Sequence, residues 1–132
     1  MLTAALASAV NSTRYPVDAF VFVQRGLDFT VRRLHGEPEP HDEDDPADMP
    51  SRHVSGQDLC MGLRDFARQE YGLLAGTVLG RWRVQRTEDF GHIVFAMVDA
   101  GMMHKTEQDS ISDFRNVFDF DEAFGAGSLT LP

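Results

Sequence analysis

Histidines and acids could form a metal site in this chain, and one pair has helical spacing. Glu88 and His92 are four residues apart and would share one face of a helix. A zinc-type site needs a third ligand, such as His53 or His104, and the spacing brings neither of them close. We therefore expect no metal site and no cofactor.

Two further features could carry catalysis, but each has a simpler structural interpretation. Cys60 could act as a nucleophile beside a histidine, yet it follows Leu59 in a segment with helical periodicity, which favours a small buried residue. Asp89-Phe90-Gly91 matches the magnesium-binding triplet of protein kinases, which also requires a Gly-rich loop, a strand lysine and a catalytic-loop Asp. The sequence holds none of these, so Asp89 is interpreted as a first-turn acid of a helix. We expect no catalytic residue, and the sequence favours a protein without enzymatic activity.

Three arginines offer a contact surface instead. Arg81, Arg83 and Arg86 bracket the turn between two predicted helices, and we refer to them as the arginine turn. Guanidinium groups supply planar contacts with several donors, suited to phosphates or to the acids of a partner protein. The other interpretation is that they pair with nearby acids of the same chain. We predict the arginine turn as the interaction patch.

Apolar residues at helical spacing predict the elements that position these side chains. We expect helices over residues 2–11, 16–34, 56–71, 73–82 and 88–100. Pro16 and Gly36 favour the start and the end of the second helix. Ser55 and Thr87 can cap the third and the fifth.

Two phenylalanines depart from the apolar stripe of the second helix. Phe22 and Phe29 fall off this stripe, which predicts a second contact face, either internal or with another subunit. The sequence is therefore compatible with a homodimer. Leu34 and Leu74 are among the residues predicted to face the core.

The C-terminal part predicts a small β-hairpin. Residues 102–105 are apolar enough for a strand, residues 106–110 form a polar turn, and phenylalanines alternate with polar residues over 113–120. Three helices followed by a hairpin is the order of a winged helix. We therefore predict a mainly α (α+β) fold with a winged-helix-like part over residues 55–120.

Length and composition predict one domain over residues 1–132. We expect N-terminal helices over 2–36, an acidic Pro-rich loop over 37–50, the winged-helix-like core over 55–120 and a tail over 121–132. The loop holds seven acids, four prolines and no base, so it accounts for most of the net charge of −9. Such a composition cannot bury enough apolar surface to order itself.

The N-terminal sequence and the length of the apolar runs predict where the protein is located. The apolar N-terminus lacks the basic start and the cleavage site of a signal peptide. No apolar run approaches the ~20 residues that span a bilayer. We expect a cytoplasmic protein without membrane contact.

Several phrases of sequence carry a resemblance to a known family. They are residues 15–23 (YPVDAFVFV), 52–57 (RHVSGQ), 87–95 (TEDFGHIVF) and 105–110 (KTEQDS), with Asp113-Phe114 and Phe118-Asp119-Phe120 after them. On these phrases the chain resembles a family of small uncharacterised bacterial proteins, found in planctomycetes and verrucomicrobia and labelled the Minf type. The resemblance implies a single domain of unknown function and supplies no catalytic residue.

The charge of the predicted reading helix decides between two functions. Residues 88–100 contain no Arg and no Lys, whereas base readout relies on Arg, Lys, Asn or Gln. Glu88 and Asp89 would instead face phosphates. The sequence therefore favours a non-enzymatic protein-interaction module with a protein partner. A nucleic-acid-binding, winged-helix-like regulator is the alternative, and a steep loss of binding with rising salt would favour it.

Overall fold

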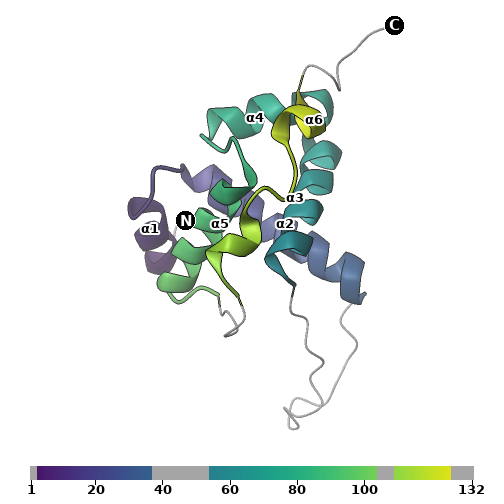
Figure 1. Cartoon of the computed structure of the whole chain (residues 1–132). Helices are drawn as coiled ribbons and strands as arrows, with labels where there is room; N and C mark the ends of the chain where they lie inside the picture. Colours follow the sequence, from purple (N-terminus) through teal and green to yellow (C-terminus); the bar gives the residue numbers. More distant parts are fainter. Residues whose placement is uncertain (1–2, 37–53, 104–108, 126–132) are drawn as a thin grey trace, which may run out of the picture.

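The computed structural model describes residues 3–36, 54–103 and 109–125, and these residues form helices without any strand (Figure 1). The helices are α1 (Ala4–Asn11), α2 (Val17–His35), α3 (Gly56–Tyr71), α4 (Ala75–Arg81), α5 (Thr87–Asp99) and α6 (Phe120–Phe124), with two short 3-10 helices, η2 (Gly72–Leu74) and η3 (Ile111–Phe114). The predicted acidic loop 37–50, most of the predicted turn 106–110 and the end of the predicted tail lie outside the described residues. None of the described helices combines the length and the apolar composition needed to cross a membrane.

Caps and glycines set the helix ends largely as predicted. Pro16 is the N-cap of α2, and Gly36 ends α2 in the left-handed region with a φ of 78°. The Ser55 hydroxyl accepts a 3.1 Å hydrogen bond from the backbone N–H of Asp58 at the start of α3. Gly72 ends α3 with a φ of 54°. The mainly α prediction is confirmed.

Glycines let α2 and α3 approach closely. A Cβ added at Gly62 of α3 would collide with the Thr30 side chain of α2, and one added at Gly26 of α2 would collide with the Leu63 side chain of α3. Both contacts are buried, because Thr30 and Leu63 are fully inaccessible to solvent. α5 packs beside this pair and contacts α1, α2, α3 and η3 (Figure 1). The core therefore lies where α2, α3 and α5 meet.

Side-chain burial decides between the two alternatives for Phe22 and corrects two other predictions. Phe22 lies off the predicted stripe, yet it is buried and its ring centroid lies 5.5 Å from that of Phe66, so it makes an internal contact. Leu34 and Leu74 were predicted to face the core, but they are 48% and 63% exposed. Leu34 lies in the last turn of α2 and Leu74 lies in η2, outside α4. At such element ends the helical stripe no longer runs against a neighbouring helix.

The predicted hairpin, and with it the winged-helix-like fold, is wrong. Residues 109–125 form η3 and α6 and contain no strand, and the described part of the predicted strand 102–105 is a bend. Asn116 has a φ of 49°, which is incompatible with an extended strand. The Asp113 carboxylate accepts a hydrogen bond from the Ser110 N–H at 3.0 Å. The Asp119 carboxylate caps α6 by accepting from the Asp121 N–H at 2.7 Å. Local side-chain bonds thus replace the ladder that a hairpin would need.

Thr87 anchors this C-terminal segment to α5. Its buried hydroxyl donates to the Phe114 carbonyl at 2.5 Å and accepts from the Val117 N–H at 3.1 Å. Thr87 was predicted as the N-cap of α5, but Arg86 is the N-cap and Thr87 is the first helical residue. A Cβ at Gly91 would lie 2.8 Å from Cγ of Phe114, so this glycine leaves the space that the ring fills. The segment therefore packs as turns against α5.

A buried carboxylate joins the segment between α1 and α2 to the start of α5. Asp89 lies in the first turn of α5 as predicted, but its side chain is fully buried. One oxygen accepts hydrogen bonds from the Tyr15 hydroxyl at 2.5 Å and from the Arg14 guanidinium at 3.2 Å. The other accepts from the backbone N–H groups of Gln85 at 2.8 Å and Arg86 at 3.2 Å. Burial, together with the hydrogen bond to Asp89 and its charge, raises the pKa of Tyr15 to about 12.

Replacing Thr87 tests the anchor. Thr87→Val should lower the free energy of unfolding by about 1–3 kcal/mol, because it leaves a buried carbonyl and an N–H without partners. Thr87→Ser keeps the hydroxyl and should lower it less. Urea titrations followed by circular dichroism give both values. A larger loss in Thr87→Ser than in Thr87→Val would show that the methyl group, and not the hydroxyl, holds the segment.

Candidate functional site

The histidines do not assemble into a metal site in the described part of the chain. His92 is exposed on α5, while His41, His53 and His104 lie outside the described residues. Residues 3–36, 54–103 and 109–125 hold no group of three or more side chains that could bind a metal ion. The pairing of Glu88 with His92 therefore finds no third ligand within these ranges.

Cys60 has the environment of a core residue. Its side chain is completely buried in α3. Burial, followed by the charge of Glu88, raises the pKa of the Cys60 thiol to about 12. A thiol with this pKa carries almost no thiolate at neutral pH, so it is a poor nucleophile.

The arginine turn lies at the surface between α4 and α5. Arg81 is the last residue of α4, Arg83 follows in the left-handed region with a φ of 65°, and Arg86 is the N-cap of α5. All three are exposed, and no ion pair joins any of them to another residue that the structure describes. The alternative in which they pair with nearby acids is therefore not seen within these residues. Their role in binding stays a prediction.

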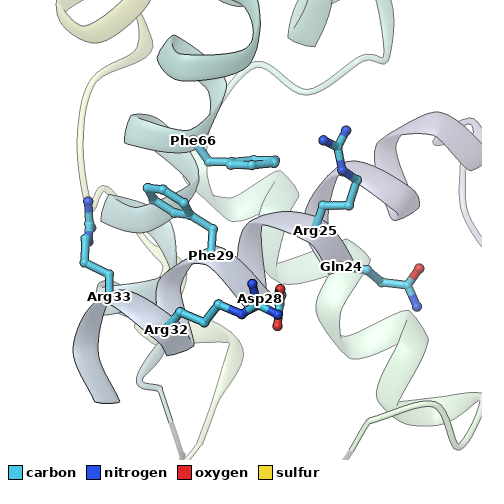
Figure 2. Close-up of a pocket in the computed structure, with 7 residues that line it drawn as sticks. All are labelled: Gln24, Arg25, Asp28, Phe29, Arg32, Arg33 and Phe66. Atoms are coloured by element: carbon cyan, nitrogen blue, oxygen red, sulfur yellow. Dashed lines mark ion pairs between the residues drawn. The ribbon is translucent and has the colours of Figure 1, made fainter. Parts of the chain in front are cut away.

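A groove between α2 and α3 gathers the side chains best placed for binding (Figure 2). This α2–α3 groove has a volume of about 680 Å³ and is lined by Gln24, Arg25, Asp28, Phe29, Arg32, Arg33 and Phe66. All of these except Phe66 come from α2, where residues 25, 29 and 33 form one helical row and residues 24, 28 and 32 form the next. The polar groups of the lining are three guanidinium groups, one carboxylate and one amide.

Two phenylalanines form the apolar floor of the groove. The ring centroids of Phe29 and Phe66 lie 5.3 Å apart with an interplanar angle of 41°. The guanidinium carbon of Arg25 lies 5.3 Å from the Phe66 centroid, and that of Arg33 lies 5.3 Å from the Phe29 centroid. Figure 2 shows the two arginines on opposite sides of the ring pair. The floor is therefore aromatic and both of its ends are cationic.

Acids of α3 hold these arginines in place. Arg25 bonds Glu70 at 2.5 Å and Arg33 bonds Asp65 at 2.6 Å. Burial acts to raise the pKa of Asp65, but hydrogen bonds from Arg64 and Arg33 and their positive charges outweigh it, so this pKa lies below its ordinary value. The Asp65 carboxylate is therefore ionised at neutral pH and fixes Arg33.

The same arginines keep donors for a ligand. The side chains of Arg25 and Arg33 are 54% and 40% exposed. Each ion pair uses one guanidinium nitrogen, whereas the group carries five N–H donors. The remaining donors can bind an anionic group placed over the floor.

Sequence reasoning did not find the α2–α3 groove, although part of the signal was present. The two rows at spacing four were visible, and Phe29 was already assigned to a second contact face. Neither observation identifies Phe66 as its neighbour, because that contact depends on how α2 crosses α3. The groove is therefore a property of the packing.

Comparisons with protein-family models, with curated proteins and with solved structures find no match to this chain. The resemblance to the Minf type stays a prediction. The geometry of the described residues is therefore the basis for any function assigned to this chain.

Cys60 gives a direct test of the interpretation as a core residue. In the folded protein at pH 8, its labelling by a thiol reagent should be at least ~100-fold slower than in denaturing urea, because the thiol is buried and protonated. Absorbance of the released chromophore measures both rates. Rapid labelling of the native protein would contradict this and would restore Cys60 as a candidate nucleophile.

Proposed function

We propose that this chain is a non-enzymatic protein-interaction module that binds an acidic segment of a partner protein in the α2–α3 groove. The observation that carries the proposal is the packed ring pair of Phe29 and Phe66 between two exposed arginines, Arg25 and Arg33. Aromatic residues and arginine are the side chains most enriched at the centres of protein interfaces.

Charge and span support an acidic segment as the occupant. Arg25 and Arg33 are each paired with one acid of α3 and keep further N–H donors, so they can offer charged hydrogen bonds to carboxylates. Arg25 and Arg33 are separated by two helical turns, roughly 12 Å along the axis of α2. An extended peptide of about four residues covers this distance. A carboxylate would bind the spare donors of each arginine, and an apolar side chain between them would cover the ring edges.

The cost of ordering the groove is small. Arg25 and Arg33 are already held by Glu70 and Asp65 and by the aromatic rings beneath them. Immobilising a long side chain on binding typically costs about 0.5–1.5 kcal/mol. Part of this conformational entropy is already lost when the protein folds, so it is not lost again on binding. Pre-ordered arginines therefore favour binding at this groove.

The nucleic-acid-binding alternative has lost its structural support. It rested on a winged-helix order, and the described residues contain no wing. Binding to a protein is therefore the preferred function.

A photo-reactive amino acid in place of Gln24 tests the proposal. Gln24 is exposed and lines the groove, so the probe should cross-link a partner protein in native lysate. We expect mass spectrometry to place the adduct in an acidic segment of that partner. The same probe at Asn11, exposed at the end of α1 and outside the groove lining, should not give this adduct.

Two substitutions in the groove should change the affinity for the partner in opposite directions. Phe29→Ala should weaken partner binding about 30-fold or more, as loss of an aromatic anchor does at a hot spot. Asp28→Asn removes the acid of the lining and should strengthen binding. Circular dichroism checks that both variants are folded. An adduct that persists unchanged in Phe29→Ala would exclude the groove, and an adduct that disappears with nuclease would favour the nucleic-acid alternative.

The arginine turn is tested in the same assay. Replacing Arg81, Arg83 and Arg86 together by Ala should weaken partner binding roughly fivefold or more, the effect of losing about 1 kcal/mol at an interface. The unfolding temperature should change little, because these side chains make no ion pair with other described residues. Unchanged binding would remove the arginine turn from the interface and leave the α2–α3 groove alone.

A further inference from the structure

A second cavity, of about 630 Å³, lies between the segment joining α1 to α2 and one face of α5. We refer to it as the connector cavity. Its wall includes Arg14 from the joining segment, Arg86 at the N-cap of α5, and three residues of α5, namely His92, Phe95 and Asp99. The three α5 residues follow at spacings of three and four, so they lie on one helix face. No residue lines both this cavity and the α2–α3 groove.

The buried Asp89 carboxylate brings two arginines to one end of the connector cavity. Its Oδ1 accepts from the Arg14 guanidinium at 3.2 Å, and its Oδ2 accepts from the Arg86 backbone N–H at 3.2 Å. A single carboxylate therefore holds the Arg14 guanidinium with one oxygen and the Arg86 backbone with the other. The Arg14 side chain is 56% exposed, and its guanidinium carbon lies 5.4 Å from the centroid of the Tyr15 ring. Asp89 and the Tyr15 ring thus hold the Arg14 side chain, while other N–H donors of its guanidinium group remain for a ligand.

The charges at this end favour an anion. Arg14 and Arg86 outnumber Asp89, whose oxygens are already occupied by four hydrogen bonds. The charge of Glu88 raises the pKa of the buried Cys60 thiol, and Glu88 does not line the cavity. The only acid among the lining residues is Asp99, which is roughly 20 Å from Arg86 along the axis of α5. The cavity therefore has a cationic end and an acidic end.

We propose that the connector cavity binds a small organic phosphate, with the phosphate group between Arg14 and Arg86 and the apolar part of the ligand along Phe95. Guanidinium groups match phosphate oxygens in a bidentate arrangement, and His92 adds a nitrogen to the same wall. The volume lies within the range of small-molecule sites, roughly 300–1,000 Å³. Asp99 opposes a second anionic group at the far end, which favours a monoester over a polyanion.

Calorimetric titration with phenyl phosphate tests the site, in a buffer of low ionic strength without phosphate or sulfate. We expect saturable binding that is tighter than binding of inorganic phosphate, because only the ester reaches Phe95. Arg86→Gln should weaken it at least about tenfold, since it removes a charged hydrogen-bonding partner. This substitution keeps the backbone N–H of residue 86 that donates a hydrogen bond to Asp89, so the unfolding temperature should not change. Arg83→Gln removes an equal charge outside the cavity lining and should leave binding unchanged.

Three outcomes would overturn the proposal. Absence of saturable phenyl phosphate binding to the folded wild-type protein would exclude the site. Equal weakening in Arg83→Gln and Arg86→Gln would indicate non-specific attraction to the surface. Inorganic phosphate that binds as tightly as the ester would refute the place given to Phe95. None of these results bears on the α2–α3 groove, so the two proposals fail or stand independently.

Discussion

The buried carboxylate of Asp89 is the interaction on which the arrangement of the helices depends. A carboxylate out of water is costly unless donors meet its charge, and here four donors do so. Arg14 and Tyr15 come from the segment between α1 and α2, and Gln85 and Arg86 come from the turn before α5. The carboxylate is satisfied only when both segments lie together, so it selects one docking of the N-terminal helices on α5. The same bonds hold the Arg14 guanidinium and the Arg86 backbone on one carboxylate, and both residues line the connector cavity.

Close helix packing generates the α2–α3 groove in a comparable way. Gly26 and Gly62 remove the side chains that would separate α2 from α3. The helices then cross near enough for Phe29 to reach Phe66 and for the arginines of α2 to reach the acids of α3. A side chain at either glycine would push the helices apart and would open the floor of the groove. The groove is therefore shaped in part by residues that do not line it.

Local signals explain which elements were predictable from the sequence. The five predicted helices follow from apolar periodicity and from caps such as Ser55, which act within a few residues. The hairpin over 102–120 was wrong because alternation of phenylalanines was weighed above two other local signals, the Ser110–Asp113 bond and the Asp119 cap. The burial of Asp89 could not be predicted, because its partner Tyr15 lies 74 positions away in sequence. Both candidate sites depend on such distant contacts, and for this reason the sequence pointed only to the arginine turn.

Net charge alone does not predict what a local site on this chain prefers, because electrostatic interactions in salt solution have a short range. The value of −9 counts every acid of the chain, including the seven of residues 37–50. A bound group responds mainly to charges within about one Debye length, ~8 Å at physiological salt. Inside that radius the three arginines of the groove lining meet Asp28, Asp65 and Glu70, and the two arginines at one end of the connector cavity meet the saturated Asp89. The overall charge governs solubility and long-range approach, whereas the nearest charges and hydrogen-bond donors decide what each site prefers. The two proposed anion sites are therefore compatible with an acidic net charge.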